Sequence, residues 1–176
     1  MIGWGFRAAG VPGAVARKVV IGVIGGQRPP PERREHAEAV GRLVAQAGAV
    51  LVCGGLGGVM EDACRGAKSA GGLTVGILPG ADRAEANPFV DVAVVTGMGT
   101  ARNVIVVRTA DALVAVDGSF GTLSEIAHAL DQGKRVISLG SWDLAAAGVD
   151  PARILTARTP EEAVRLALAE ASRGQP

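Results

Sequence analysis

The sequence predicts a single α/β domain, a Rossmann-like doubly wound parallel sheet with helices on both faces. Short β-branched runs alternate with Ala-, Glu- and Arg-rich stretches of helical length along most of the chain. The runs are continuously apolar, as in strands that are covered on both faces. The glycines gather at the ends of these runs, where a strand would turn into a helix.

The first half of the domain contains three of the expected strands. Residues 19–24 form a β-branched run that closes on two glycines, and residues 31–47 then carry apolar side chains at helical spacing. Residues 49–53 predict a second strand, followed by the glycine turn and helix of "GGLGGVMEDACRGAKSAGG". Residues 73–78 predict a third strand, which ends in a Pro-Gly pair.

The middle of the chain contains one ambiguous segment. A loop over residues 81–89 leads to a strand at 91–95, and residues 112–116 form the next buried strand. Residues 104–107 are all β-branched, so local propensity favours a strand there. A helix would instead preserve the alternation of strands and helices. We expect the helix.

The last third of the chain completes the domain. We expect a helix at 122–131, a strand at 135–139 and a final helix that ends near Ala171. An N-cap threonine, a proline and two glutamates open this last helix. Residues 19–176 therefore form one domain, preceded by an N-terminal extension over residues 1–18.

Composition excludes several classes of function. The chain has 176 residues, is 48% apolar and carries a formal net charge of +1. This charge gives no electrostatic basis for binding nucleic acid or an anionic membrane surface. Aromatic residues make up only 3% and tyrosine is absent, which argues against a platform for single-stranded nucleic acid. No apolar run reaches the roughly 20 residues that a membrane span needs.

The cysteines and histidines indicate a cytoplasmic protein without a metal site. Cys53 and Cys64 fit neither a CxxC motif nor a disulfide framework, and we expect both to be small buried residues. His36 and His128, the two histidines of the chain, are distant from both cysteines in sequence. We therefore expect no metal ligands.

Three glycine-rich turns point to a binding site: the first at residues 25–26, the second at 54–58 and the third at 118–122. In an open parallel sheet, ligands bind beyond the carboxyl ends of the strands, where the strand order reverses. Glycine lets backbone N–H groups approach an anion, and the following helix adds positive charge at its N-terminus. We expect a small phosphorylated ligand and no nucleic acid partner. The expected binding residues are Gly25, Gly26, Gly54, Gly55, Gly57, Gly58, Asn103, Gly118, Ser119, Phe120, Gly121 and Thr122.

The same turns exclude two familiar nucleotide-binding classes. The first turn does not read GxGxxG, and the second lacks the third glycine. The strand at 73–78 ends in Leu-Pro, so it provides no acidic residue for a ribose hydroxyl. No GxxxxGK[ST] motif is present. Neither an NAD-binding protein nor a P-loop NTPase fits.

Two segments carry a resemblance to a known family. "MGTARN" (98–103) followed by "GSFGTLSE" (118–125) resembles the paired signature of the Lonely Guy superfamily, an Arg-containing segment followed by PGGxGTxxE. "CGGLGGVMEDACRGA" with "VGILPG" resembles another glycine turn and strand of that family. The match covers most of residues 19–140.

The resemblance implies roles for individual residues. In enzymes of that family, the Arg and the final Glu act in cleaving the N-glycosidic bond of a nucleoside 5′-monophosphate. These catalytic residues correspond to Arg102 and Glu125, and the phosphate-binding positions correspond to Gly118, Gly121 and Thr122. No cofactor is required for that chemistry. The resemblance also implies a homodimer or a higher homo-oligomer.

The departures from the family pattern favour a different subgroup. Asp117 and Ser119 stand where the family has Pro and Gly, and the neighbourhood of Arg102 lacks one basic residue. "GMGTARN" with "GTLSEIAHAL" is more similar to the molybdenum cofactor carrier-like proteins, which bind a phosphorylated pterin cofactor. Some superfamily members are labelled lysine decarboxylases, but no lysine here lies in a pyridoxal phosphate motif.

Three functions follow in order of preference. The first is a carrier-type protein for a small phosphorylated ligand, either a nucleotide monophosphate or a molybdopterin-type cofactor. The second is a nucleoside-5′-monophosphate phosphoribohydrolase that uses Arg102 and Glu125. The third is an interaction protein without a ligand.

Overall fold

The computed structural model describes residues 17–173 of the chain. Most of the expected N-terminal extension, residues 1–16, therefore lies outside the described residues. The described part is a seven-stranded parallel sheet with the strand order β4-β3-β2-β1-β5-β6-β7. The strands are β1 Val20–Gly25, β2 Val50–Cys53, β3 Thr74–Leu78, β4 Val92–Val95, β5 Ala112–Val116, β6 Val136–Leu139 and β7 Ile154–Thr156.

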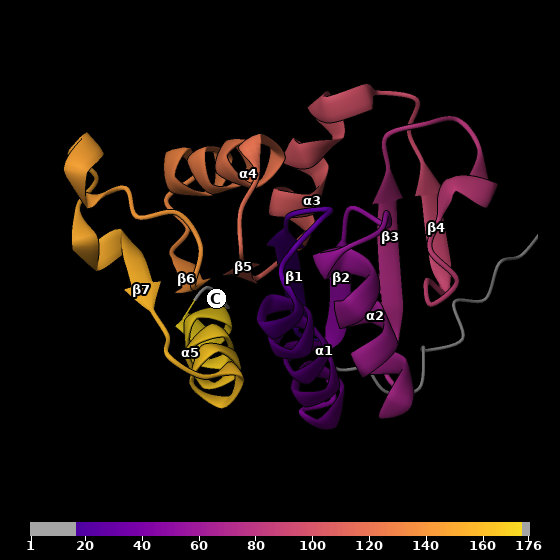
Figure 1. The fold of residues 1–176 in the computed structure, drawn as a ribbon, viewed down its shortest axis with the longest axis horizontal. Helices are drawn as coiled ribbons and strands as arrows, with labels where there is room; N and C mark the ends of the chain where they lie inside the picture. Colours follow the sequence, from indigo (N-terminus) through magenta and orange to yellow (C-terminus); the bar gives the residue numbers. More distant parts are fainter. Residues whose placement is uncertain (1–16, 174–176) are drawn as a thin grey trace, which may run out of the picture.

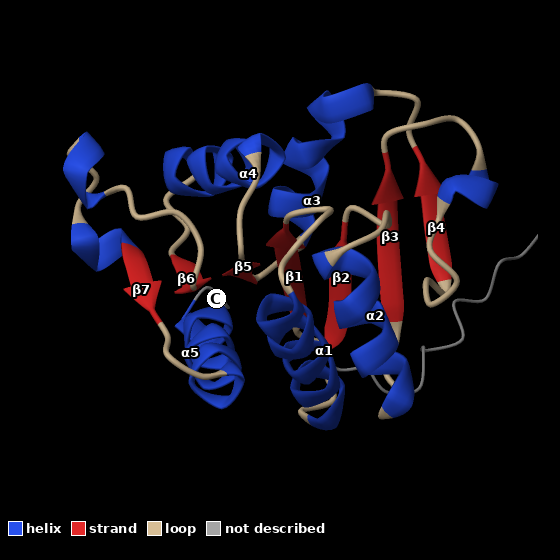
Figure 2. Ribbon diagram, in the orientation of Figure 1, coloured by secondary structure: helices blue, strands red, loops and turns tan. Residues whose placement is uncertain are grey.

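Five α-helices cover the two faces of the sheet, which confirms the predicted doubly wound Rossmann-like fold. They are α1 Pro31–Gln46, α2 Val59–Ser69, α3 Asn103–Thr109, α4 Phe120–Asp131 and α5 Pro160–Arg173. Helices α1, α2 and α5 pack together on one face, and α3 and α4 pack on the other (Figures 1 and 2). No helix within residues 17–173 has the length and apolarity of a membrane span.

Alternate residues of the strands supply the two halves of the core. In β1, Ile21 and Val23 are fully buried against the α1, α2 and α5 face, while Ile24 is buried on the α3 and α4 face. This is the period-2 alternation of a strand that is covered on both sides. Cys53 and Cys64 are buried in the first of these clusters with free thiols, as expected.

The strand order places a binding crevice between β1 and β5. The chain runs outward from β1 to β4 and then crosses back to pair β5 with the other side of β1. The connections after β1 and β5 therefore leave in opposite directions, which opens a crevice beyond the carboxyl ends of these strands. Gly25 pairs with Val116 at that edge, so the first and third glycine turns lie side by side.

Most predicted elements are confirmed, including the helix at the ambiguous β-branched segment, which is α3. Helix α4 begins at Phe120, two residues before the predicted start, because Ser119 forms its N-cap. The sequence interpretation missed β7, a three-residue edge strand that is only half-buried. Such a short strand has too few apolar positions to show a period.

Candidate functional site

The first and third glycine turns and the start of α3 enclose one cavity at the reversal point of the sheet. Its volume is about 260 Å³. The lining residues are Gly25, Gln27, Met60, Arg102, Asn103, Ser119, Gly121, Thr122 and Glu125. Both expected catalytic residues and most of the expected residues of the third turn thus face one space.

Arg102 and Glu125 form a buried ion pair in this cavity. Their exposed fractions are 7% and 6%, and Arg102 Nη1 donates to Glu125 Oε1 at 3.1 Å. Arg102 Nη1 also donates to Asn103 Oδ1 at 2.6 Å. Asn103 in turn donates from Nδ2 to Ser124 Oγ at 3.3 Å. Asn103 therefore braces the arginine against α4, a role that the sequence left open.

One nitrogen of the buried guanidinium has no partner. Arg102 Nε is buried and has no hydrogen-bond acceptor among the described residues. A buried donor without an acceptor costs about 1–3 kcal/mol, and more on a charged group. Arg102 also lines the cavity, where its guanidinium is the one cationic group among the described lining residues and could form charge-assisted hydrogen bonds with an anion.

Burial raises the pKa of Glu125 to about 7, and the favourable charge and hydrogen bond of Arg102 lower it. Desolvation is the larger effect because the carboxylate has lost nearly all contact with water. A carboxyl group with a pKa near 7 is divided between its two protonation states at neutral pH. It could therefore either donate or accept a proton in the cavity.

The start of α4 provides a second feature that suits a negative charge. The Ser119 N–H donates to Thr122 Oγ1 at 3.2 Å, so these two residues form a reciprocal cap. Phe120 and Gly121 occupy the first two helical positions, where no intrahelical acceptor exists for their N–H groups. These N–H groups and the helix dipole favour a negative charge at this end of α4.

The glycine turn at residues 54–58 does not line the cavity but packs against Arg102, which does. A Cβ on Gly54 would overlap the Arg102 guanidinium, so this glycine makes room for the arginine. Gly55 and Gly58 have positive φ angles of 74° and 71° and pack against neighbouring backbone, whereas a Cβ on Gly57 would make only an ordinary contact with Glu61 at 3.6 Å. The site is thus built from the first and third turns.

Asp117 adds a negative charge beside the third glycine turn. Its φ of 56° makes it the one positive-φ residue other than glycine among the described residues. A Cβ on Gly26 would lie only 2.7 Å from Asp117 Oδ2, so the carboxylate lies over the first glycine turn. Gly26 leaves space for it, and its carbonyl accepts from the Val59 N–H at 3.0 Å. The strained aspartate is therefore held at the mouth of the site.

Three residues near the site are outside the predicted set. Gln27 and Met60 line the cavity, and Trp142 packs against Gly118, where a Cβ would lie 2.5 Å from the indole Nε1. Gln27 directly follows the first glycine turn, and this position is a signal that could have identified it. Met60 and Trp142 carry no comparable signal, because only the folded chain brings Met60 to the cavity and Trp142 to the third glycine turn.

Comparison with known proteins places this arrangement in a family. The model of the SLOG cluster4 family matches residues 18–164. The chain belongs to the SLOG cluster4 family. This family is Lonely Guy-like, so the resemblance in the two sequence segments is confirmed. A protein of Archaeoglobus fulgidus is 49% identical over 144 residues, which cover 82% of this chain and 91% of that protein.

Two solved structures of related proteins share the fold over nearly their whole length. The molybdenum cofactor binding protein of Rippkaea orientalis is 40% identical, with a TM-score of 0.83 over 88% of this chain and 98% of that chain. The molybdenum cofactor carrier protein of Chlamydomonas reinhardtii is 34% identical, with a TM-score of 0.82 over 89% and 99%. The SLOG cluster4 chain therefore resembles cofactor carriers in sequence and in fold.

Proposed function

We propose that this protein binds the molybdenum cofactor as cargo, through the cofactor's phosphate, at the carboxyl ends of β1 and β5. The observation that carries the proposal is Arg102, the one cationic side chain among the described residues that line the cavity at the start of α4. The similarity to cofactor-binding and carrier proteins supports the same ligand. The Phe120 and Gly121 N–H groups and Arg102 would hold the phosphate.

Reconstitution with the isolated molybdenum cofactor tests the proposal. The protein is mixed with the cofactor, separated by gel filtration, and assayed for molybdenum by mass spectrometry and for pterin by fluorescence. We expect molybdenum and pterin to elute together with the protein at a saturable ratio. Elution of both with the small molecules alone would contradict carriage. A Val92→Ala variant at the far edge of the sheet serves as a matched control that should retain both.

One observation favours the phosphoribohydrolase as a second candidate. Glu125 combines a pKa of about 7 with a position beside Arg102, as a group that orients water or stabilises a ribosyl cation would require. Incubation with AMP, followed by chromatography for free adenine, decides between the two. Adenine release by the wild-type protein that is absent in Glu125→Gln would support the hydrolase function in place of the carrier function. Binding of AMP without release of adenine would exclude the hydrolase function.

Asp117→Asn is expected to strengthen the binding of a phosphorylated ligand about three- to tenfold. The substitution removes a negative charge from the mouth of the site, and asparagine tolerates the positive φ of this position. Calorimetric titration with ribose 5-phosphate measures the change. An equal gain in Asp131→Asn, an exposed acid at the C-terminal end of α4, would assign the effect to net charge rather than to position. An unchanged affinity would show that Asp117 does not face the bound phosphate.

The expected homo-oligomer stays a prediction. Strand β4 is an edge strand of the sheet, and its Val92, Val94 and Val95 side chains are exposed. An apolar edge of this kind is typical of surfaces that meet another chain.

A further inference from the structure

An exposed aromatic pair lies directly beside the third glycine turn. Phe120, the first residue of α4, is 83% exposed and stacks on Trp142 with ring centroids 6.3 Å apart and planes 29° apart. The whole chain contains three phenylalanines, two tryptophans and no tyrosine. Two of these five rings thus meet at the site from distant segments. The two rings together form an exposed apolar patch beside the helix start, and such patches are typical of ligand-binding grooves.

The indole is held in place against the turn. Trp142 Nε1 donates to the carbonyl of Ser119 at 3.2 Å. Gly118 has no room for a side chain because the indole fills that space. The ring pair is therefore attached to the residues that cap α4, and it stands next to the N–H groups of the helix start.

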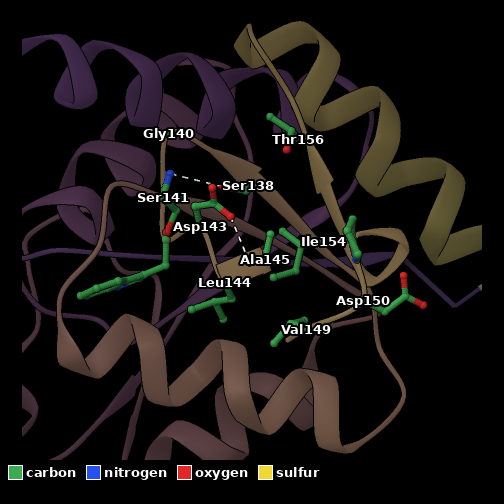
Figure 3. Close-up of a pocket in the computed structure, with 12 residues that line it drawn as sticks. Ser138, Gly140, Ser141, Asp143, Leu144, Ala145, Val149, Asp150, Ile154 and Thr156 are labelled. Carbon is green, nitrogen blue, oxygen red and sulfur yellow. Dashed lines mark hydrogen bonds between the residues drawn. The ribbon is translucent and has the colours of Figure 1, made fainter. Parts of the chain in front are cut away.

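A second cavity opens on the other side of Trp142. Its volume is about 340 Å³, and the loop after β6 and the segment around β7 line it (Figure 3). Leu144, Val149 and Ile154 provide apolar surface, whereas Asp143 provides a carboxylate. The cavity thus combines apolar walls with a carboxylate.

The two cavities have opposite chemical character. Arg102 and the N-terminus of α4 line the first cavity, and their positive charge favours a phosphate there. Asp143 and Asp150 line the second cavity and would repel a phosphate, but their oxygens accept hydrogen bonds from ring N–H and amino groups. A ligand with a phosphate at one end and a nitrogen-rich ring at the other can therefore lie across Trp142 in one orientation only.

We propose that the Phe120–Trp142 pair is the platform on which the planar heterocycle of the ligand stacks, with its amino edge toward the β6–β7 cavity. The inference rests on the proposed function, because it takes the phosphate as anchored at α4. Bases stack on aromatic side chains through their π-faces, and removal of such a ring typically weakens binding about tenfold. The pair would thus select a bicyclic ring over a phosphorylated sugar alone.

Tryptophan fluorescence tests the platform directly. Trp4→Phe leaves Trp142 as the single tryptophan in a chain without tyrosine. The probes are GMP, whose guanine shares the 2-amino-4-oxo pyrimidine ring of a pterin, and ribose 5-phosphate, which has no ring base. We expect GMP to quench Trp142 saturably, and ribose 5-phosphate to bind calorimetrically without comparable quenching. Binding of GMP without quenching would overturn the platform.

Substitution of the exposed ring gives the quantitative test. Phe120→Ala is expected to weaken GMP binding about tenfold and ribose 5-phosphate binding less than about twofold. Phe120→Tyr should keep both affinities, and Val92→Ala, which removes exposed apolar surface elsewhere, should change neither. Equal loss for the two probes in Phe120→Ala would overturn the platform but leave the phosphate site intact. Failure of both probes to bind the wild-type protein would overturn the proposed function as well.

Discussion

Arg102→Ala is expected to weaken the binding of a phosphorylated ligand at least about a hundredfold. The guanidinium is the one buried cation of the cavity, and its Nε has no acceptor among the described residues. A hydrogen bond between charged groups contributes about 1.5–3 kcal/mol, and a phosphate can accept more than one from a guanidinium. Calorimetric titration with ribose 5-phosphate and with the molybdenum cofactor measures the loss.

The same substitution is expected to reduce stability in a pH-dependent way. At pH 8, Arg102→Ala removes the partner of Glu125, whose pKa then rises further above 7, and protonation of this side chain costs the variant about 1.4 kcal/mol more stability at pH 8 than at pH 5. At pH 5 the cost is smaller, because a carboxyl group with a pKa of about 7 is already protonated in the folded protein. Urea unfolding at the two pH values gives the difference.

The sign follows from linkage. The folded-state pKa of Glu125 lies above the ordinary glutamate value of 4.5. Protonated Glu125 therefore contributes its full stabilisation below pH 4.5, and this stabilisation is lost as the pH rises through about 7. Arg102 lowers the pKa of Glu125, so its removal raises this pKa further and deepens the loss at high pH.

The double variant Arg102→Ala/Glu125→Gln separates the two effects. A neutral glutamine needs no ion-pair partner, so we expect the double variant to regain most of the stability at pH 8 and none of the binding. If the single variant lost equal stability at pH 5 and pH 8, the buried-carboxylate explanation would be wrong. If the double variant bound phosphate normally, Arg102 would not be an anion ligand.

The features that local chemistry determines could be predicted from the sequence. The continuous apolar strands predicted the parallel sheet, and "GSFGTLSE" predicted a helix start, which Ser119 and Thr122 cap. The helix over residues 103–109 was accessible only through the alternation of elements, since its β-branched run favours a strand by propensity. In this segment the connection between parallel strands requires a helix in spite of the local strand propensity.

The features that depend on distant segments could not be predicted in this way. Trp142 reaches Ser119 from a loop without a motif, and Arg102 is buried only because α4 brings Glu125 to it. Gly54 fits a phosphate-binding turn in the sequence, yet in the fold it makes room for a guanidinium. A residue type limits what a position can do, but the packing partner decides which of these roles it has.

Gly41 shows the same limit in the core, and it gives the largest expected loss of stability. Helices α1 and α2 approach so closely that a Cβ on Gly41 would overlap the carbonyl oxygen of Ala63, and one on Gly66 would overlap that of Glu38. Reciprocal glycines thus hold the two helices at backbone contact. Gly41→Ala is expected to destabilise the protein by about 3 kcal/mol or more, since overpacking against backbone has no flexible side chain to absorb it.

Helix propensity alone predicts that Gly41→Ala stabilises the protein, whereas the close contact of α1 and α2 predicts a loss, so the measurement distinguishes the two. In an exposed helix, Gly→Ala stabilises by roughly 1 kcal/mol. Gly57→Ala serves as the control, because the nearest atom to a Cβ there is 3.6 Å away and its φ is not positive. We expect urea unfolding to show little change for Gly57→Ala and a large loss for Gly41→Ala. A stabilised Gly41→Ala would mean that α1 and α2 do not meet at this glycine. The orientation of α2, and with it the position of Met60 and of the second glycine turn behind Arg102, would then need another cause.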